Sequence, residues 1–81
     1  MLGVLTVYSR SYCHLCDDMI AALRNLQGRC VFDIKVVDVD SDAALEARYG
    51  ERVPVVEADG RELCHYFLDE AAVTDFLSKM R

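Results

Sequence analysis

Several features that define other protein classes are missing from this sequence of 81 residues. It has no apolar run near the roughly 20 residues that a membrane-spanning helix requires, and no basic leader precedes its first apolar segment. The net charge is −5, and lysine and arginine do not cluster, which argues against binding of nucleic acid or anionic lipid. We therefore expect a cytoplasmic protein without a membrane or nucleic-acid partner.

Proline and glycine are also scarce, with one and four residues, and this composition excludes a disordered or low-complexity chain. Hydrophobic residues make up 53% of the sequence, enough to build a core. Because so short a chain buries little surface, we expect one compact, monomeric domain over residues 1–81. The four cysteines do not indicate a disulfide scaffold, since no secretory signal accompanies them.

The order of apolar segments predicts an alternation of strands and helices. The almost uniformly apolar segment 2–8 is typical of a strand covered on both faces, and apolar residues at helical spacing predict a helix over 13–27. Segment 30–40 alternates apolar and polar residues, as an edge strand parallel to the first would. A short helix is expected over 41–50, with Ser41 as its N-cap.

The last third of the sequence predicts a hairpin followed by a helix. Asp59-Gly60 is a strong turn signal between two antiparallel strands, and Asp69 is placed as the N-cap of the final helix. The element order is therefore βαβαββα. A right-handed βαβ unit followed by a hairpin gives an α/β fold with a four-stranded mixed sheet and helices on both faces.

The stretch SYCHLC carries the chemistry, because it places Cys13 at the start of the first helix. Free backbone N–H groups and the helix dipole stabilise an anion there, so we expect a lowered pKa for the Cys13 thiol and a thiolate nucleophile. Cys16 lies one turn further on the apolar stripe and is predicted to be the more buried thiol. This asymmetry suits disulfide exchange, in which Cys13 attacks and Cys16 resolves the mixed disulfide.

Charged neighbours act on this thiolate in opposite directions. His14, when protonated, favours the thiolate and is assigned a tuning role, although a solvated residue at the helix start is the simpler interpretation. Asp17 and Asp18 repel the thiolate. The sequence alone does not decide the direction in which these neighbours together shift the pKa of Cys13.

A zinc site is the main alternative use of the cysteines, and we expect no metal. The other candidate ligands are Cys30 and the adjacent pair Cys64 and His65. Neighbouring residues of a strand point to opposite faces, so Cys64 and His65 cannot easily share one ion. Cys30 and Cys64 are then expected to be small buried hydrophobic residues. A role for Cys64 as a third thiol near the site stays open.

Pro54 and Tyr12 are the remaining candidates, and both are assigned to substrate binding together with Val53. A cis bond before Pro54 would present the Val53 backbone to an extended substrate, whereas a trans proline would only begin an edge strand. The residues alone do not decide between the two. Tyr12 as a simple cover of its loop is likewise left open.

Taken with the βαβαββα order, Cys13-His14-Leu15-Cys16 and Val53-Pro54 resemble the thioredoxin superfamily, and in particular its compact glutaredoxin-like proteins. The resemblance covers nearly the whole chain. It implies Cys13 as nucleophile, Cys16 as resolving thiol and Pro54 as a cis proline. It also implies glutathione as a possible co-substrate, held by a glycine pair and an acidic residue. In this sequence the position of the glycine pair falls on Cys64-His65, and that of the acidic residue falls near Asp69. Asp69 is better explained as the N-cap of the last helix.

The sequence therefore predicts a thiol–disulfide oxidoreductase that reduces or exchanges protein or small-molecule disulfides through Cys13 and Cys16, without a bound cofactor. Its electron donor would be a reductase or glutathione. Two alternatives stay open: a glutathione-coupled glutaredoxin, and a non-enzymatic thioredoxin-fold module that binds a partner or an iron–sulfur cluster.

Overall fold

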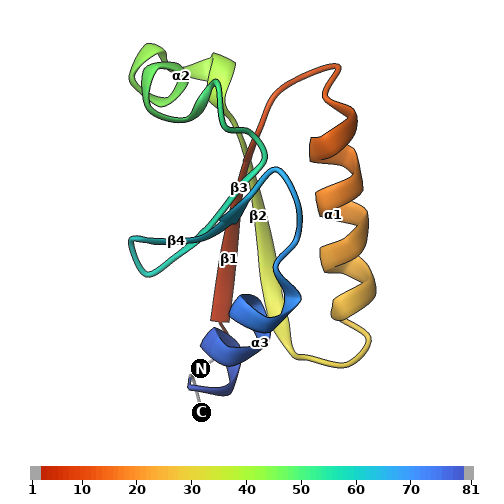
Figure 1. Ribbon diagram of the computed structural model, residues 1–81. Helices are drawn as coiled ribbons and strands as arrows, with labels where there is room; N and C mark the ends of the chain where they lie inside the picture. Colours follow the sequence, from red (N-terminus) through yellow and green to blue (C-terminus); the bar gives the residue numbers. More distant parts are fainter. Residues whose placement is uncertain (1–2, 80–81) are drawn as a thin grey trace.

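The computed structural model describes residues 3–79 and has the predicted element order (Figure 1). The elements are β1 (Gly3–Ser9), α1 (His14–Leu26), β2 (Phe32–Asp38), the one-turn 3-10 helix η1 (Val39–Ser41), α2 (Ala43–Tyr49), β3 (Val55–Ala58), β4 (Arg61–His65) and α3 (Glu70–Ser78). None of the helices within residues 3–79 is long and apolar enough to cross a lipid bilayer.

The four strands form one mixed sheet in the order β2-β1-β3-β4. β1 pairs parallel to β2, the predicted edge strand, and antiparallel to β3, while β3 pairs antiparallel to β4. Asp59 and Gly60 connect β3 and β4 with φ angles of 51° and 75°. A turn with two positive φ angles matches the right-handed twist of the strands, so the predicted hairpin is confirmed.

The main core lies between the sheet and the two helices α1 and α3. Leu5 and Val7 of β1 are fully buried and share one apolar cluster with Leu23 of α1 and Val73 of α3. Asp69 caps α3 as predicted, because its Oδ1 accepts a hydrogen bond from the Ala72 amide at 3.0 Å. The packing of β1 against α1 and α3 positions the loop that joins the carboxyl end of β1 to the N-terminus of α1.

The opposite face of the sheet is covered by α2 only at one end. Tyr49 of α2 stacks on Tyr8 of β1 with ring centroids 4.0 Å apart, whereas Val4, at the other end of β1, is 47% exposed. The expectation that β1 is covered along both faces is therefore wrong, because a helix of seven residues is too short to reach its beginning. Leu2, the first residue of the predicted strand, lies outside the described residues.

The start of α2 also differs from the prediction. Ser41 is not its N-cap but the last residue of η1, where its hydroxyl donates to the Asp38 carbonyl at 2.6 Å. Asp42 takes the capping role instead, because its Oδ1 accepts from the Ala44 amide at 2.8 Å. A serine already bonded inside the preceding turn leaves the first free amides of the helix to the next polar residue.

Candidate functional site

Cys13 is the N-cap of α1, where the loop after β1 delivers it. Its backbone is extended (φ −114°, ψ 105°), and its Sγ accepts a hydrogen bond from the Cys16 amide at 3.1 Å. The two cysteines are joined by a disulfide, with their Cα atoms 5.2 Å apart. The N-terminal amides and the dipole of a 13-residue helix thus converge on the Cys13 sulfur.

The two sulfurs differ in exposure, as predicted. Cys13 is half-buried, whereas Cys16 is only 1% exposed and lies in an apolar cluster with Val53 and Tyr49. An incoming molecule therefore reaches Cys13 before it reaches Cys16. The roles of nucleophile and resolving thiol stay predictions, and this geometry is compatible with them.

The loop before β3 packs against the two cysteines. The Val53–Pro54 peptide bond is cis, as the resemblance implied, and Val53 belongs to the same cluster as Cys16 and Cys13. The Pro54 carbonyl accepts a hydrogen bond from the Tyr66 amide at 2.9 Å. Within residues 3–79, neither the amide nor the carbonyl of Val53 forms a backbone hydrogen bond.

Two of the candidate residues point away from this cluster. Tyr12 adopts a positive φ of 57° at the tip of the loop and is fully exposed, so it covers nothing. His14 is the first residue of α1 and is also exposed. Among the described residues the His14 side chain forms no hydrogen bond, so its tuning role stays a prediction.

A polar network on the face of the sheet that α2 covers was not predicted. The hydroxyl of Tyr49 donates to Glu57 Oε2 at 2.7 Å, and the hydroxyl of Tyr8 lies 3.5 Å from Glu57 Oε1. Burial, followed by the bond to Glu57, raises the pKa of Tyr49. Since Tyr49 packs beside Cys16, this network fixes α2 next to the buried sulfur. Neighbouring residues of a strand point to opposite faces, so the position of Tyr8 next to the core residue Val7 is the sequence signal that could have assigned Tyr8 to the other face.

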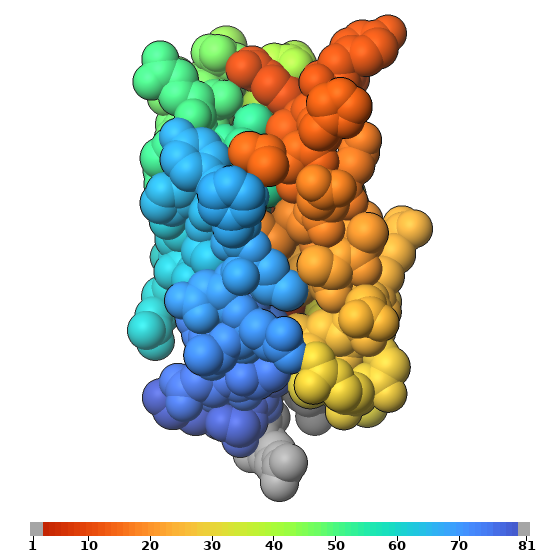
Figure 2. All heavy atoms as spheres, turned by 45° about the vertical axis from the view of Figure 1, so that its right-hand side comes forward, coloured from red at the N-terminus to blue at the C-terminus, as the bar shows by residue number. Residues whose placement is uncertain are grey.

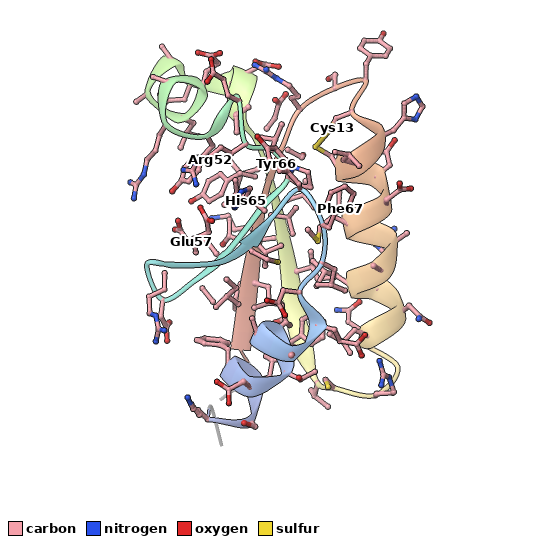
Figure 3. The ribbon with its side chains drawn as sticks, viewed as in Figure 1. Cys13, Arg52, Glu57, His65, Tyr66 and Phe67 are labelled. Carbon is pink, nitrogen blue, oxygen red and sulfur yellow. A yellow bond between two sulfur atoms is a disulfide. The ribbon has the colours of Figure 1, made fainter. Side chains whose placement is uncertain are left out.

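A second unpredicted cluster joins the loop before β3 to β4. Arg52 pairs with Glu62, and His65 Nδ1 lies 2.8 Å from the second carboxylate oxygen of Glu62. Burial opposes the ionisation of Glu62, but the hydrogen bonds from His65 and Arg52 outweigh it and lower the pKa of this carboxyl. Figure 3 shows Arg52 and His65 on the same side of the sheet, away from Cys13.

Cys64 and His65 lie on opposite faces of β4, as the strand geometry predicted. Cys64 pairs with Val56 and packs against the main core, and burial raises the pKa of its thiol. His65 pairs with Val55 and binds Glu62 instead. Within the described part of the chain, no group of three histidine, cysteine or acidic side chains is placed to hold a metal ion.

Comparisons with known proteins place nearly the whole described chain in one family. The model of the family "Glutaredoxin-like domain (DUF836)" matches residues 4–78. The uncharacterized protein Rv0508 of Mycobacterium tuberculosis is 36% identical over 67 residues, which are 76% of this chain and 69% of that protein. Neither of these matches comes with an established activity.

Solved structures agree with the family match. Protein Ne2328 from Nitrosomonas europaea is 43% identical, covers 95% of this chain and 93% of its own, and superposes with a TM-score of 0.87. A mutant thioredoxin from Halobacterium salinarum is 28% identical and has a TM-score of 0.61, covering 95% of this chain and 73% of its own. The fold is thus that of thioredoxin, with a pair of cysteines at the start of its first helix.

Proposed function

This chain belongs to the glutaredoxin-like domain family, and on that premise we propose that it is a thiol–disulfide oxidoreductase acting through Cys13 and Cys16. The observation that carries the proposal is the inequality of the two sulfurs. Cys13 is half-buried at the N-terminus of α1, and Cys16 is 1% exposed behind it. One accessible and one recessed thiol, close enough to bond, are what a two-step exchange requires.

In the first step, the Cys13 thiolate attacks one sulfur of a substrate disulfide. The substrate S–S bond breaks, a mixed disulfide forms with Cys13, and the second substrate sulfur leaves as a thiolate that takes up a proton. The Cys16 amide, which donates to Cys13 Sγ in this structure, stabilises the negative charge before the attack. Asp17, in the first turn of α1, opposes that charge.

In the second step, Cys16 loses its proton and attacks Cys13 Sγ. The mixed disulfide breaks, the Cys13–Cys16 bond forms, and the substrate leaves as a dithiol. Two electrons have then passed from the protein to the substrate. The two sulfurs carry both electrons, so no metal or organic cofactor is needed, and a dithiol reductase or glutathione restores the reduced pair.

We propose that the loop around Val53 and Pro54 holds the substrate chain. The unpaired amide and carbonyl of Val53 can add an extended segment by main-chain hydrogen bonds, beside the accessible sulfur. Tyr12, fully exposed one residue before Cys13, is available for contact with the same segment. We also propose that the reaction takes place in the cytoplasm, where a reducing environment maintains thiols in the dithiol state.

The proposal is tested by equilibrating the protein in buffers of defined dithiol-to-disulfide ratio and quenching with acid. Mass spectrometry should show a reversible loss of two hydrogens, mapped by digestion to the pair Cys13 and Cys16. A bond that never forms, or one that forms between other cysteines, would refute the proposal. Iron–sulfur absorbance in protein purified without oxygen, with no such redox couple, would support the binding-module alternative.

A further inference from the structure

A groove of about 160 Å³ begins at the active-site helix and runs beside it. One wall is α1, with Leu15, Asp18 and Met19, and the other is the segment after β4, with Tyr66, Phe67 and Leu68. Leu15 is the sequence neighbour of Cys16, so the groove lies near the disulfide, although neither cysteine lines it. Figure 2 views this side of the molecule, with the segment after β4 in light blue next to α1 in orange.

The wall formed by Tyr66 and Phe67 is held firmly against the candidate site. Tyr66 adopts a left-handed backbone conformation (φ 63°), and its amide donates to the Pro54 carbonyl at 2.9 Å. Its hydroxyl donates to the Glu51 carbonyl, also at 2.9 Å. A left-handed tyrosine is uncommon and must be held in place by its surroundings. The turn leaves Phe67 70% exposed on the segment that runs beside α1 (Figure 3).

Exposed Phe67 gives the groove an apolar wall that no described residue covers. An aromatic ring of this exposure gains free energy when an apolar side chain is placed against it. The groove therefore fits a substrate that carries such a side chain close to its disulfide.

Asp18 is the one charged residue among those that line the groove. Within residues 3–79 its carboxylate takes part in no ion pair or hydrogen bond, unlike Glu62 or Glu70, which are paired with arginines. An unpaired carboxylate attracts a cation and repels an anion at short range. Glutathione disulfide carries four carboxylates and two ammonium groups at neutral pH, so this charge disfavours it.

We propose that Asp18 and Phe67 select the substrate of the disulfide exchange: a protein disulfide flanked by an apolar and a basic residue. The inference rests on the proposed function and adds the partner's chemistry to it. The apolar side chain packs against Phe67, and the lysine or arginine lies beside Asp18. Small anionic disulfides such as glutathione disulfide are poor substrates, because Asp18 repels their carboxylates.

The test uses the whole protein with its dithiol reduced in advance and the excess reductant removed. Each reaction is then one turnover, in which Cys13 and Cys16 become a disulfide and the substrate disulfide becomes two thiols. The substrates are cyclic disulfide peptides flanked by leucine and lysine, by leucine and glutamate, or by serine and lysine. Glutathione disulfide and the uncharged bis(2-hydroxyethyl) disulfide complete the set, and every rate is divided by that of the uncharged compound.

For the unchanged protein at low ionic strength, the lysine peptide should react about tenfold faster than the glutamate peptide, given charges about 5 Å apart in water. Asp18→Asn should remove most of this preference and accelerate glutathione disulfide severalfold. Phe67→Ala should remove the preference for leucine over serine, which we expect to be about fivefold. The matched control Asp17→Asn changes a carboxylate outside the groove in the same helical turn, and it should lower the peptide preference by less than about twofold.

Equal rates for the lysine and glutamate peptides would overturn the inference, and so would a preference that Asp18→Asn leaves intact. Faster reaction of glutathione disulfide than of the lysine peptide would overturn it as well. None of these results would affect the proposed function, since exchange would still occur. A reduced protein that reacts with no disulfide, the uncharged one included, would refute the proposed function itself.

Discussion

The hydrogen bond between Tyr49 and Glu57 allows a quantitative test of how α2 is held beside the site. Tyr49→Phe removes one hydroxyl, which donates to the carboxylate at 2.7 Å, and leaves the ring stacked on Tyr8. A hydrogen bond to a charged group contributes about 1.5–3 kcal/mol when it is protected from water. Glu57 is half-buried, so we expect a loss of about 2 kcal/mol in the free energy of unfolding.

The matched control is Tyr8→Phe, which removes the same group from the same carboxylate. Its hydroxyl lies 3.5 Å from Glu57 Oε1, at the outer limit of hydrogen bonding, so the expected loss is below about 0.5 kcal/mol. Urea denaturation of the oxidised protein measures both variants. In a thermal scan, the loss for Tyr49→Phe should lower Tm by roughly 8–16 °C.

Equal losses for the two variants would refute this reasoning, because the distances would then not decide the strength of the bond. A loss below about 0.5 kcal/mol for Tyr49→Phe would also refute it, since the carboxylate would then be satisfied by water instead. In either case the network could not be what fixes α2 next to Cys16.

Three further predictions follow from individual contacts. Burial raises the pKa of the Cys64 thiol, so alkylation of Cys64 by iodoacetamide should need a pH above the ordinary value of about 8.5, and unfolding in urea should abolish this resistance. The pKa of Glu62 is lowered by His65 and Arg52, so its contribution to stability should be present above the unfolded value of about 4.3 and be lost as the pH falls through the folded pKa. Urea denaturation from pH 2 to 6 should show a shallower acid decline for Glu62→Gln, and an unchanged decline would contradict the contact. Asp69→Ala should destabilise the protein by about 1 kcal/mol, whereas Asp69→Asn should keep the cap of α3, and equal losses would argue against capping.

The sequence was sufficient for the parts of the fold that depend on short-range rules. The position of Cys13 follows from a strand followed closely by an apolar helical stripe, and the hairpin follows from Asp59-Gly60. The opposite orientation of Cys64 and His65 follows from the alternation of side chains along a strand. Each of these features is set by neighbours within a few residues.

The features that were missed depend on pairing between distant segments. Glu57 meets Tyr49 and Tyr8 only because β1 and β3 are neighbours in the sheet, with Tyr8 opposite Val55 and Thr6 opposite Glu57. The capping exchange at α2 is the exception, because it depends on a local bond between the Ser41 hydroxyl and the Asp38 carbonyl. The groove beside α1 exists because Tyr66 is tied to Pro54, twelve residues earlier. Such contacts need the register of the sheet, which the periodicity of one segment does not contain.

The central claim, that Cys13 attacks and Cys16 resolves, is tested most directly by trapping the mixed disulfide. Cys16→Ser and Cys13→Ser are each prepared in a chain in which Cys30 and Cys64 are also replaced by serine, and each is mixed with a disulfide peptide. We expect Cys16→Ser to accumulate one peptide on Cys13, seen by mass spectrometry as a stable adduct, and Cys13→Ser to accumulate almost none. A peptide captured by Cys16 in the absence of Cys13, at a rate equal to that of the first variant, would contradict the account.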